Sequence, residues 1–160
     1  MNRRMMFFVC IGCAFCLAAP AALADSGKVF HLNATIPTVC SLSIDTGAVM
    51  DFGSILPGVP VATRSVNGNA QCSKDAVYQI SIKDGAENRS MKHLTQPESV
   101  LGYRLCSDAT CNTPFFQTGL GLGSDVDISF TVHGKLDETS ILNALAGAYV
   151  DTVTVLIAFQ

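Results

Sequence analysis

Cysteine is the residue type in this chain most able to do covalent chemistry, with seven copies in 160 residues. Three lie near the N-terminus, and four follow at Cys40, Cys72, Cys106 and Cys111. Four cysteines permit three pairings. Cys106 and Cys111 flank Ser-Asp-Ala-Thr, a turn-like tetrapeptide, so the local spacing favours Cys106–Cys111 together with Cys40–Cys72. On chain-entropy arithmetic, the long loop would contribute roughly 3–4 kcal/mol and the short one about 2 kcal/mol.

A metal site built from Cys106, Cys111 and His133 is the alternative use of these thiols. In an oxidising compartment paired thiols normally form disulfides, so we expect no metal there. The two other histidines, His31 and His93, accompany no recognisable catalytic motif. We therefore expect neither a metal nor a cofactor.

Two aspartates offer the only hint of acid–base chemistry. Asp125 and Asp127 lie two residues apart in a predicted strand and would face the same side. On so polar a strand, two aspartates on one side more commonly mark a face exposed to solvent than a catalytic pair. The nearby glycine-rich run 119–123 lacks the context of a phosphate-binding loop, and we interpret it as a flexible loop. The chain is not expected to be an enzyme.

The N-terminus predicts export. Arg3 and Arg4 precede a continuous apolar run at 5–19, and Ala22-Leu23-Ala24 forms a small-x-small cleavage site before Asp25. The run is shorter than the roughly 20 residues that a membrane-spanning helix needs. We expect residues 1–24 to be a secretory signal peptide. The remainder has eight basic and thirteen acidic residues, a net charge of −5, which argues against nucleic acid as a partner.

The elements that must carry these residues are short strands. Alternating or β-branched runs at 76–82, 100–105, 126–132 and 149–159 are separated by turn residues, which is typical of an all-β sandwich. The closing run is the clearest, and we predict one strand there; 140–146 could form a short helical turn. The face predicted for that closing strand consists of Tyr149, Val153, Val155, Ile157 and Phe159.

The segment 28–36 permits two interpretations. Its apolar residues alternate with His31, Asn33 and Thr35, and Pro37 ends any ladder. It could be an ordinary first strand of the domain's own sheet. Alternatively, it could be a detachable strand that completes the sheet of a neighbouring subunit. The residues that would enter that neighbour are Phe30, Leu32, Ala34 and Ile36.

The order of several motifs resembles the spore coat protein U family, which includes pilins of archaic, Csu-type chaperone–usher pili. The closing segment 147–159 is the most specific likeness. Weaker matches are Cys40, Phe52-Gly53, Cys72 leading into 77–82, Asp84-Gly85 before Arg89-Ser-Met91, and Tyr103-Arg-Leu105 with Asp108. Two departures are Cys106, where an aromatic is usual, and the absence of Trp near Phe115 and Phe116.

The resemblance implies an incomplete immunoglobulin-like sandwich that lacks its last strand. It implies residues 25–37 as a donor-strand extension and 38–160 as the pilin-like domain. The expected partners are a periplasmic chaperone, an outer-membrane usher and neighbouring pilin subunits. The expected function is that of a structural subunit of a surface pilus that supports adhesion and biofilm formation. The subunit is expected to pass through the periplasm on its way to the cell surface. The alternatives are a tip or minor adhesive module, with exposed Phe115 and Phe116, and a spore-coat-type structural protein.

Overall fold

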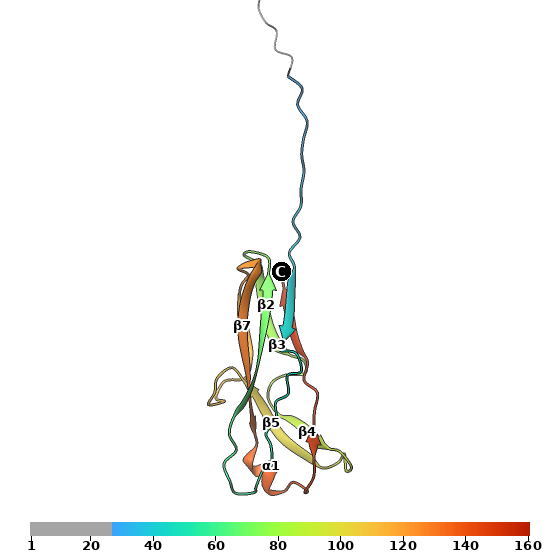
Figure 1. Ribbon diagram of the computed structural model, residues 1–160, viewed down its shortest axis with the longest axis vertical. Helices are drawn as coiled ribbons and strands as arrows, with labels where there is room; N and C mark the ends of the chain where they lie inside the picture. The colour runs from blue at the N-terminus through green and yellow to red at the C-terminus, as the bar shows by residue number, and fades with distance from the viewer. Residues whose placement is uncertain (1–26) are drawn as a thin grey trace, which may run out of the picture. The chain divides into compact units, whose positions relative to one another are not determined.

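A computed structural model describes residues 27–160. The predicted signal peptide and its cleavage site therefore lie outside the described residues. The chain divides into two units after Thr35. In the first unit, residues 27–35 are exposed and belong to no helix or strand, and they run as an extended trace (Figure 1).

The second unit, Ile36–Gln160, consists mainly of short β-strands separated by turns. Only one short helix occurs among the described residues. The elements are β1 (Cys40–Ile44), β2 (Arg64–Cys72), β3 (Val77–Ile82), β4 (Arg89–His93), β5 (Val100–Cys106), β6 (Phe116–Leu120), β7 (Gly123–Leu136), α1 (Glu138–Leu142), β8 (Tyr149–Val150) and β9 (Val155–Phe159).

These strands form two antiparallel sheets. The six-stranded sheet has the order β1-β2-β7-β5-β4-β8, and the three-stranded sheet has the order β6-β3-β9. In Figure 1, β2 and β7 lie side by side, as their long pairing requires. Buried side chains from both sheets form one hydrophobic core. This confirms the predicted all-β class, and the two packed sheets agree with an immunoglobulin-like sandwich.

The core follows the alternation read from the sequence. In β3, Tyr78, Ile80 and Ile82 are buried, while Val77 and Gln79 are exposed. The predicted strands at 76–82 and 100–105 correspond to β3 and β5, and the one at 126–132 lies within the longer β7. Period-two patterning located these strands because one face of each packs on the core.

The closing strand was predicted wrongly. The run 149–159 forms two strands in different sheets: β8 pairs with β4, and β9 pairs with β3. Asp151 lies between them, and its carboxylate accepts hydrogen bonds from Arg89 and Tyr103. Alternation could not reveal this change of sheet, because the apolar residues stay in phase through the crossover.

The glycine-rich run 119–123 is a tightly packed connection between the two sheets, so its interpretation as a flexible loop is also wrong. It joins β6 to β7. The Gly121 N–H donates to the Ala76 carbonyl at 2.7 Å, and the Asp75 N–H donates to the Gly121 carbonyl at 2.9 Å. A Cβ at Gly121 would collide with Cys72 and with the Ser73 carbonyl. Glycine is needed at position 121 because the backbone of residues 72–76 lies too close to leave room for a side chain.

Helix α1 overlaps the helical turn predicted at 140–146. Asp137 caps its N-terminus by accepting from the Thr139 N–H, and Ile141 anchors it in the core. Within residues 27–160, no helix has the length and apolar character that crossing a membrane requires.

Candidate functional site

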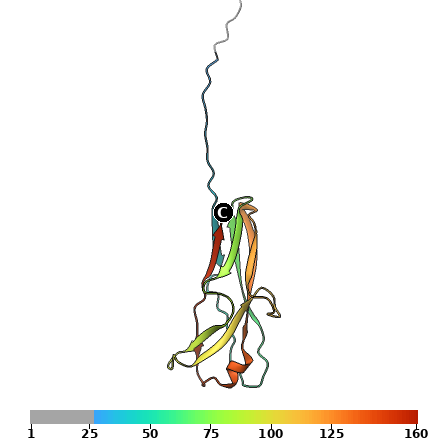
Figure 2. The same ribbon diagram turned by 180° about the vertical axis from the view of Figure 1, so that it is seen from behind.

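The sandwich ends in edge strands that have a free side. The six-stranded sheet ends in β1 and β8, and the three-stranded sheet ends in β6 and β9. Cα atoms of β1 and β9 approach within 8 Å of one another, yet the two strands share no ladder. Figure 2 shows β9 beside β1 near the C-terminus. We call this pair of neighbouring unpaired edges the β1/β9 edge site.

On the β1 side, alternation places apolar groups toward the core. Cys40 and Leu42 pack against the core cluster but stay half-buried, and Ile44 is exposed. Ser41 and Ser43 occupy the opposite face. The strand therefore presents an apolar, incompletely covered face beside its free edge.

On the β9 side the same incompleteness appears. Ile157 lies opposite Ile80 in the ladder, and Phe159 lies opposite Tyr78. Ile80 is fully buried, whereas Ile157 is half-buried and Phe159 is 42% exposed. Ile157 is less buried than its neighbour Ile80 because β9 has no hydrogen-bonded strand on its outer side among the described residues. The core is unfinished at this edge.

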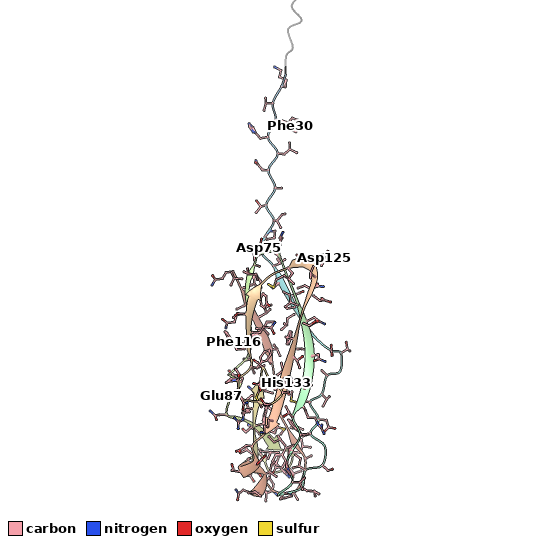
Figure 3. All side chains as sticks on the ribbon, turned by 90° about the vertical axis from the view of Figure 1, so that its left-hand side faces the viewer. Phe30, Asp75, Glu87, Phe116, Asp125 and His133 are labelled. Atoms are coloured by element: carbon pink, nitrogen blue, oxygen red, sulfur yellow. A yellow bond between two sulfur atoms is a disulfide. The ribbon has the colours of Figure 1, made fainter. Side chains whose placement is uncertain are left out.

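The predicted donor residues include some of the most exposed apolar side chains of the described chain. Phe30, Leu32 and Ile36 are 77%, 81% and 90% exposed, and Ala34 is also exposed. Figure 3 shows Phe30 on the extended segment. Residues 27–39 belong to no strand. The interpretation as an ordinary first strand of the domain's own sheet therefore finds no pairing in this structure.

The five residues predicted for the terminal strand separate into two groups. Val155, Ile157 and Phe159 lie on β9 at the edge site. Tyr149 lies on β8, where its ring packs edge-on against His93 at 5.0 Å, and its hydroxyl donates to the Leu145 carbonyl at 2.9 Å. Val153 lies in the crossover between the two strands. Only the β9 residues can contribute to the edge site.

A polar cluster fixes that crossover. Arg89 donates to the Tyr103 hydroxyl at 2.8 Å and to Asp151 at 3.1 Å, and it also donates to the carbonyls of Lys83 and Gly85. The Tyr103 hydroxyl donates to Asp151. The cluster therefore ties β4 and β5 of one sheet to the crossover that leads into β9. Sequence reasoning noted these residues only as motif matches, because no local pattern joins them.

The electrostatics of the cluster keep it intact at neutral pH. Burial, followed by the neighbouring Asp151 carboxylate, raises the pKa of Tyr103 to about 12, so its hydroxyl stays a donor. Burial alone would raise the pKa of Asp151, but hydrogen bonds from Tyr103 and Arg89 outweigh it and hold that pKa below its ordinary value. Asp151 is therefore an ionised acceptor.

Both disulfides join the cysteines that local spacing favoured. Cys40–Cys72 links β1 to β2, with Cα atoms 4.1 Å apart. Cys106–Cys111 closes the connection between β5 and β6, with Cα atoms 5.0 Å apart. Within that connection, the Asp108 carboxylate accepts from the N–H groups of Thr110, Asn112 and Thr113.

The aromatic pair considered for an adhesive tip does not form. Phe115 is buried and packs against Phe130, with ring centroids 6.0 Å apart. Phe116 alone is exposed, as Figure 3 shows. The prediction that both rings are exposed is therefore wrong for Phe115, which lies just before β6 and packs into the core.

The candidate catalytic groups do not converge. Asp127 accepts from the Gln71 side chain at 2.9 Å, and Asp125 is exposed near the start of β7. His93 is buried, and its Nδ1 accepts from the backbone of Thr95 and Gln96. No group of three or more His, Cys, Asp or Glu side chains that could hold a metal occurs in residues 27–160.

Comparisons with known proteins follow this geometry. No curated protein matches the chain. One chain of a crystal structure is similar, with a TM-score of 0.50 and 20% identity: the CsuC-CsuE chaperone-tip adhesion subunit pre-assembly complex from archaic chaperone-usher Csu pili of Acinetobacter baumannii. The likeness covers 77% of this chain and 40% of that one, so this chain spans less than half of its length. At this identity the likeness concerns the fold.

A match to a family model assigns the chain to a family, which the likeness in fold alone does not. The model described as Spore Coat Protein U domain matches residues 27–156, which include the exposed N-terminal segment and most of the sandwich. The chain therefore belongs to the Spore Coat Protein U domain family.

Proposed function

We propose that this chain is a structural subunit of a surface pilus and that it polymerises by donor-strand exchange. The observation that carries the proposal is the unfinished core at the β1/β9 edge site, in a chain whose N-terminal segment presents unpaired, alternating apolar residues. An exposed hydrophobic edge invites the addition of a strand. Residues 25–37 would supply that strand to a second copy, and 38–160 would form the accepting domain.

The chemistry of the exchange is β-augmentation. A donor beside β9 would form main-chain hydrogen bonds with its free edge, and Phe30, Leu32, Ala34 and Ile36 would cover the half-buried face of Ile157. Burying each large apolar side chain contributes about 1.5–3 kcal/mol. His31, Asn33 and Thr35 would face solvent.

Insertion also requires a small opening of the acceptor. A strand paired with both β1 and β9 sets them two strand spacings apart, about 9.6 Å. Their Cα atoms approach within 8 Å in the unpaired subunit. The donor would therefore separate the two edges as it enters, with β1 and β9 as the walls of the acceptor site.

The proposed partners follow from the same exposure. Before assembly, a subunit with open edges needs a temporary cover, and a periplasmic chaperone would lend one. The similar crystal structure is itself a chaperone–subunit complex, which supports this role. We further propose that an outer-membrane usher exchanges the chaperone for the next subunit, after export directed by residues 1–24. The subunit would act without catalysis, and the fibre would support adhesion and biofilm formation.

The test is the state of assembly. The chain is co-expressed with its chaperone, and the wild type is compared with Leu32→Asp/Ile36→Asp on unboiled denaturing gels and by electron microscopy. The proposal predicts heat-labile ladders or fibres for the wild type and only chaperone-bound monomer for the variant, because two carboxylates cannot enter an apolar site.

The matched control is Asn33→Asp/Thr35→Asp, which adds the same charge to the opposite face of the segment. It should assemble like the wild type. Identical monomers for all three chains would contradict donor-strand exchange and would leave a single secreted β-domain.

A further inference from the structure

We propose that the Cys40–Cys72 disulfide carries the tension on a fibre from the donor segment of each subunit into that subunit's own six-stranded sheet, an inference that rests on the proposed function. In a fibre joined by donor strands, each donor is continuous in sequence with the domain that follows it. Tension pulling on residues 28–36 must therefore pass through Pro37, Thr38 and Val39 and enter the domain at Cys40.

The entry point is a weak place in the sheet. Strand β1 has only five residues, and its sole hydrogen-bonded neighbour is β2. Strand β2 is nine residues long and is paired on both sides, with β1 and with β7. Backbone hydrogen bonds at an edge can break one after another when the end of the strand is pulled. Without a further link, tension would peel β1 from β2, starting at Cys40.

The structure places a covalent bond at that end. Cys40 lies opposite Cys72 in the ladder, and the disulfide joins them. Ser73 reinforces the junction: its N–H donates to the Val39 carbonyl at 2.9 Å, and its hydroxyl accepts from the Val39 N–H at 3.1 Å. Load arriving at residue 40 thus passes directly into β2 and the centre of the six-stranded sheet.

Peeling β1 would also undo the fibre, because β1 is one wall of the β1/β9 edge site. Tension applied to the N-terminal segment of a subunit would then weaken the binding of its neighbour's donor strand. The disulfide therefore prevents tension on the donor segment of a subunit from opening that subunit's own β1/β9 edge site, which holds the donor of its neighbour. The Cys106–Cys111 bond closes the β5–β6 connection and lies outside this path, so it serves as a matched control.

The experiment stretches single fibres with optical tweezers. Wild-type fibres are compared with Cys40→Ser/Cys72→Ser fibres and with Cys106→Ser/Cys111→Ser fibres. If the first variant fails to assemble, assembled Cys106→Ser/Cys111→Ser fibres are treated with dithiothreitol, so that Cys40–Cys72 is the disulfide that is reduced, and thiol alkylation confirms cleavage. Loss of Cys40–Cys72 should add a low-force lengthening step of up to about 80 Å per subunit, the reach of the chain from Cys40 to Arg64 where β2 begins. Fibres should then break at lower force.

The control variant should stretch like the wild type. Identical force–extension curves with and without Cys40–Cys72 would overturn the inference while leaving donor-strand exchange intact. Failure of oxidised wild-type chains to form fibres would instead count against the proposed function. In that case single full-length chains, held at their two ends, still decide whether the disulfide suppresses the same step.

Discussion

At the scale of single residues, Asp151 decides where the chain changes sheets. It accepts from Arg89 at 3.1 Å and from the Tyr103 hydroxyl, so the segment between β8 and β9 is held by groups on β4 and β5. Asp151 is 27% exposed and Arg89 13% exposed at their side chains, so this pair is less screened than a surface ion pair. We expect the direction in which β9 leaves the crossover to depend on this contact.

Replacing Asp151 with Asn should lower the free energy of unfolding at pH 7 by about 1–3 kcal/mol, because buried donors lose a charged acceptor. A carboxyl whose pKa is lowered in the folded state contributes stability above its unfolded pKa. That contribution is lost as the pH falls through the folded pKa. The wild type should therefore lose stability below about pH 4, and the variant should lose less over that window. Urea unfolding at several pH values measures both effects.

The control for this prediction is Asp125→Asn, which removes a carboxylate that is exposed near the start of β7. It should leave the stability at pH 7 close to that of the wild type. Equal effects of the two substitutions would contradict the role assigned to Asp151.

Residue-level prediction from sequence succeeded where the signal was local. The six-residue span from Cys106 to Cys111 indicated a disulfide because its ends must lie close together. Phe115 and Phe116 were both expected at the surface, yet Phe115 is buried in the core. The Arg89–Asp151 contact joins residues 62 apart, and no periodicity can indicate such a pair.

At the scale of elements, β3 and β9 show what an unfinished sheet does to burial. They are paired along their length, and Ile80 of β3 lies opposite Ile157 of β9. Strand β3 is covered by β6 on one side and β9 on the other, whereas β9 has β3 alone. The difference in burial between Ile80 and Ile157 therefore comes from the neighbours of each strand, because the two residues are of the same type.

Alanine substitutions in these strands should reveal this difference. Ile80→Ala should destabilise the free subunit by about 2–5 kcal/mol, as expected for a fully buried residue. Ile157→Ala should cost about 1 kcal/mol in the free subunit, because the side chain is already partly in water. In assembled fibres the cost of Ile157→Ala should approach that of Ile80→Ala. Denaturant unfolding of both forms tests this, and an unchanged small cost after assembly would argue against a donor beside β9.

A strand could be predicted from the sequence where its apolar and polar residues alternate clearly. The buried positions of β3 follow strictly from Tyr78, Ile80 and Ile82. The closing segment shows the limit: Tyr149 and Ile157 share one phase but lie in different sheets. Sheet membership depends on long-range partners, which alternation does not contain. For the same reason, the sequence suggested β9 as part of the candidate site but not its neighbour β1.

At the scale of the whole molecule, donor-strand exchange requires a domain that is incomplete at one edge. The sandwich has a connected core, yet its β1/β9 edge site remains uncovered, and residues 27–39 belong to no strand. Such a subunit should be marginally stable alone and much more stable once a strand is added.

Peptide complementation should show this gain. A chain lacking residues 25–37 is mixed with a synthetic peptide of that sequence, and the melting temperature is followed. At a peptide concentration of 100 times Kd, the gain should be about 2.7 kcal/mol. A peptide carrying Leu32→Asp and Ile36→Asp should give no shift, and one carrying Asn33→Asp and Thr35→Asp should behave like the native sequence. Equal shifts for all three peptides would indicate non-specific binding.

The most direct test of the central claim is to locate residue 32 within an assembly. A photoreactive leucine analogue replaces Leu32 in one population of subunits, which is mixed during assembly with heavy-isotope-labelled copies and then irradiated. Donor-strand exchange predicts cross-links to heavy peptides that contain β1 (Cys40–Ile44) or β9 (Val155–Phe159). Cross-links confined to the light chain itself, or to other strands of the heavy copy, would contradict it.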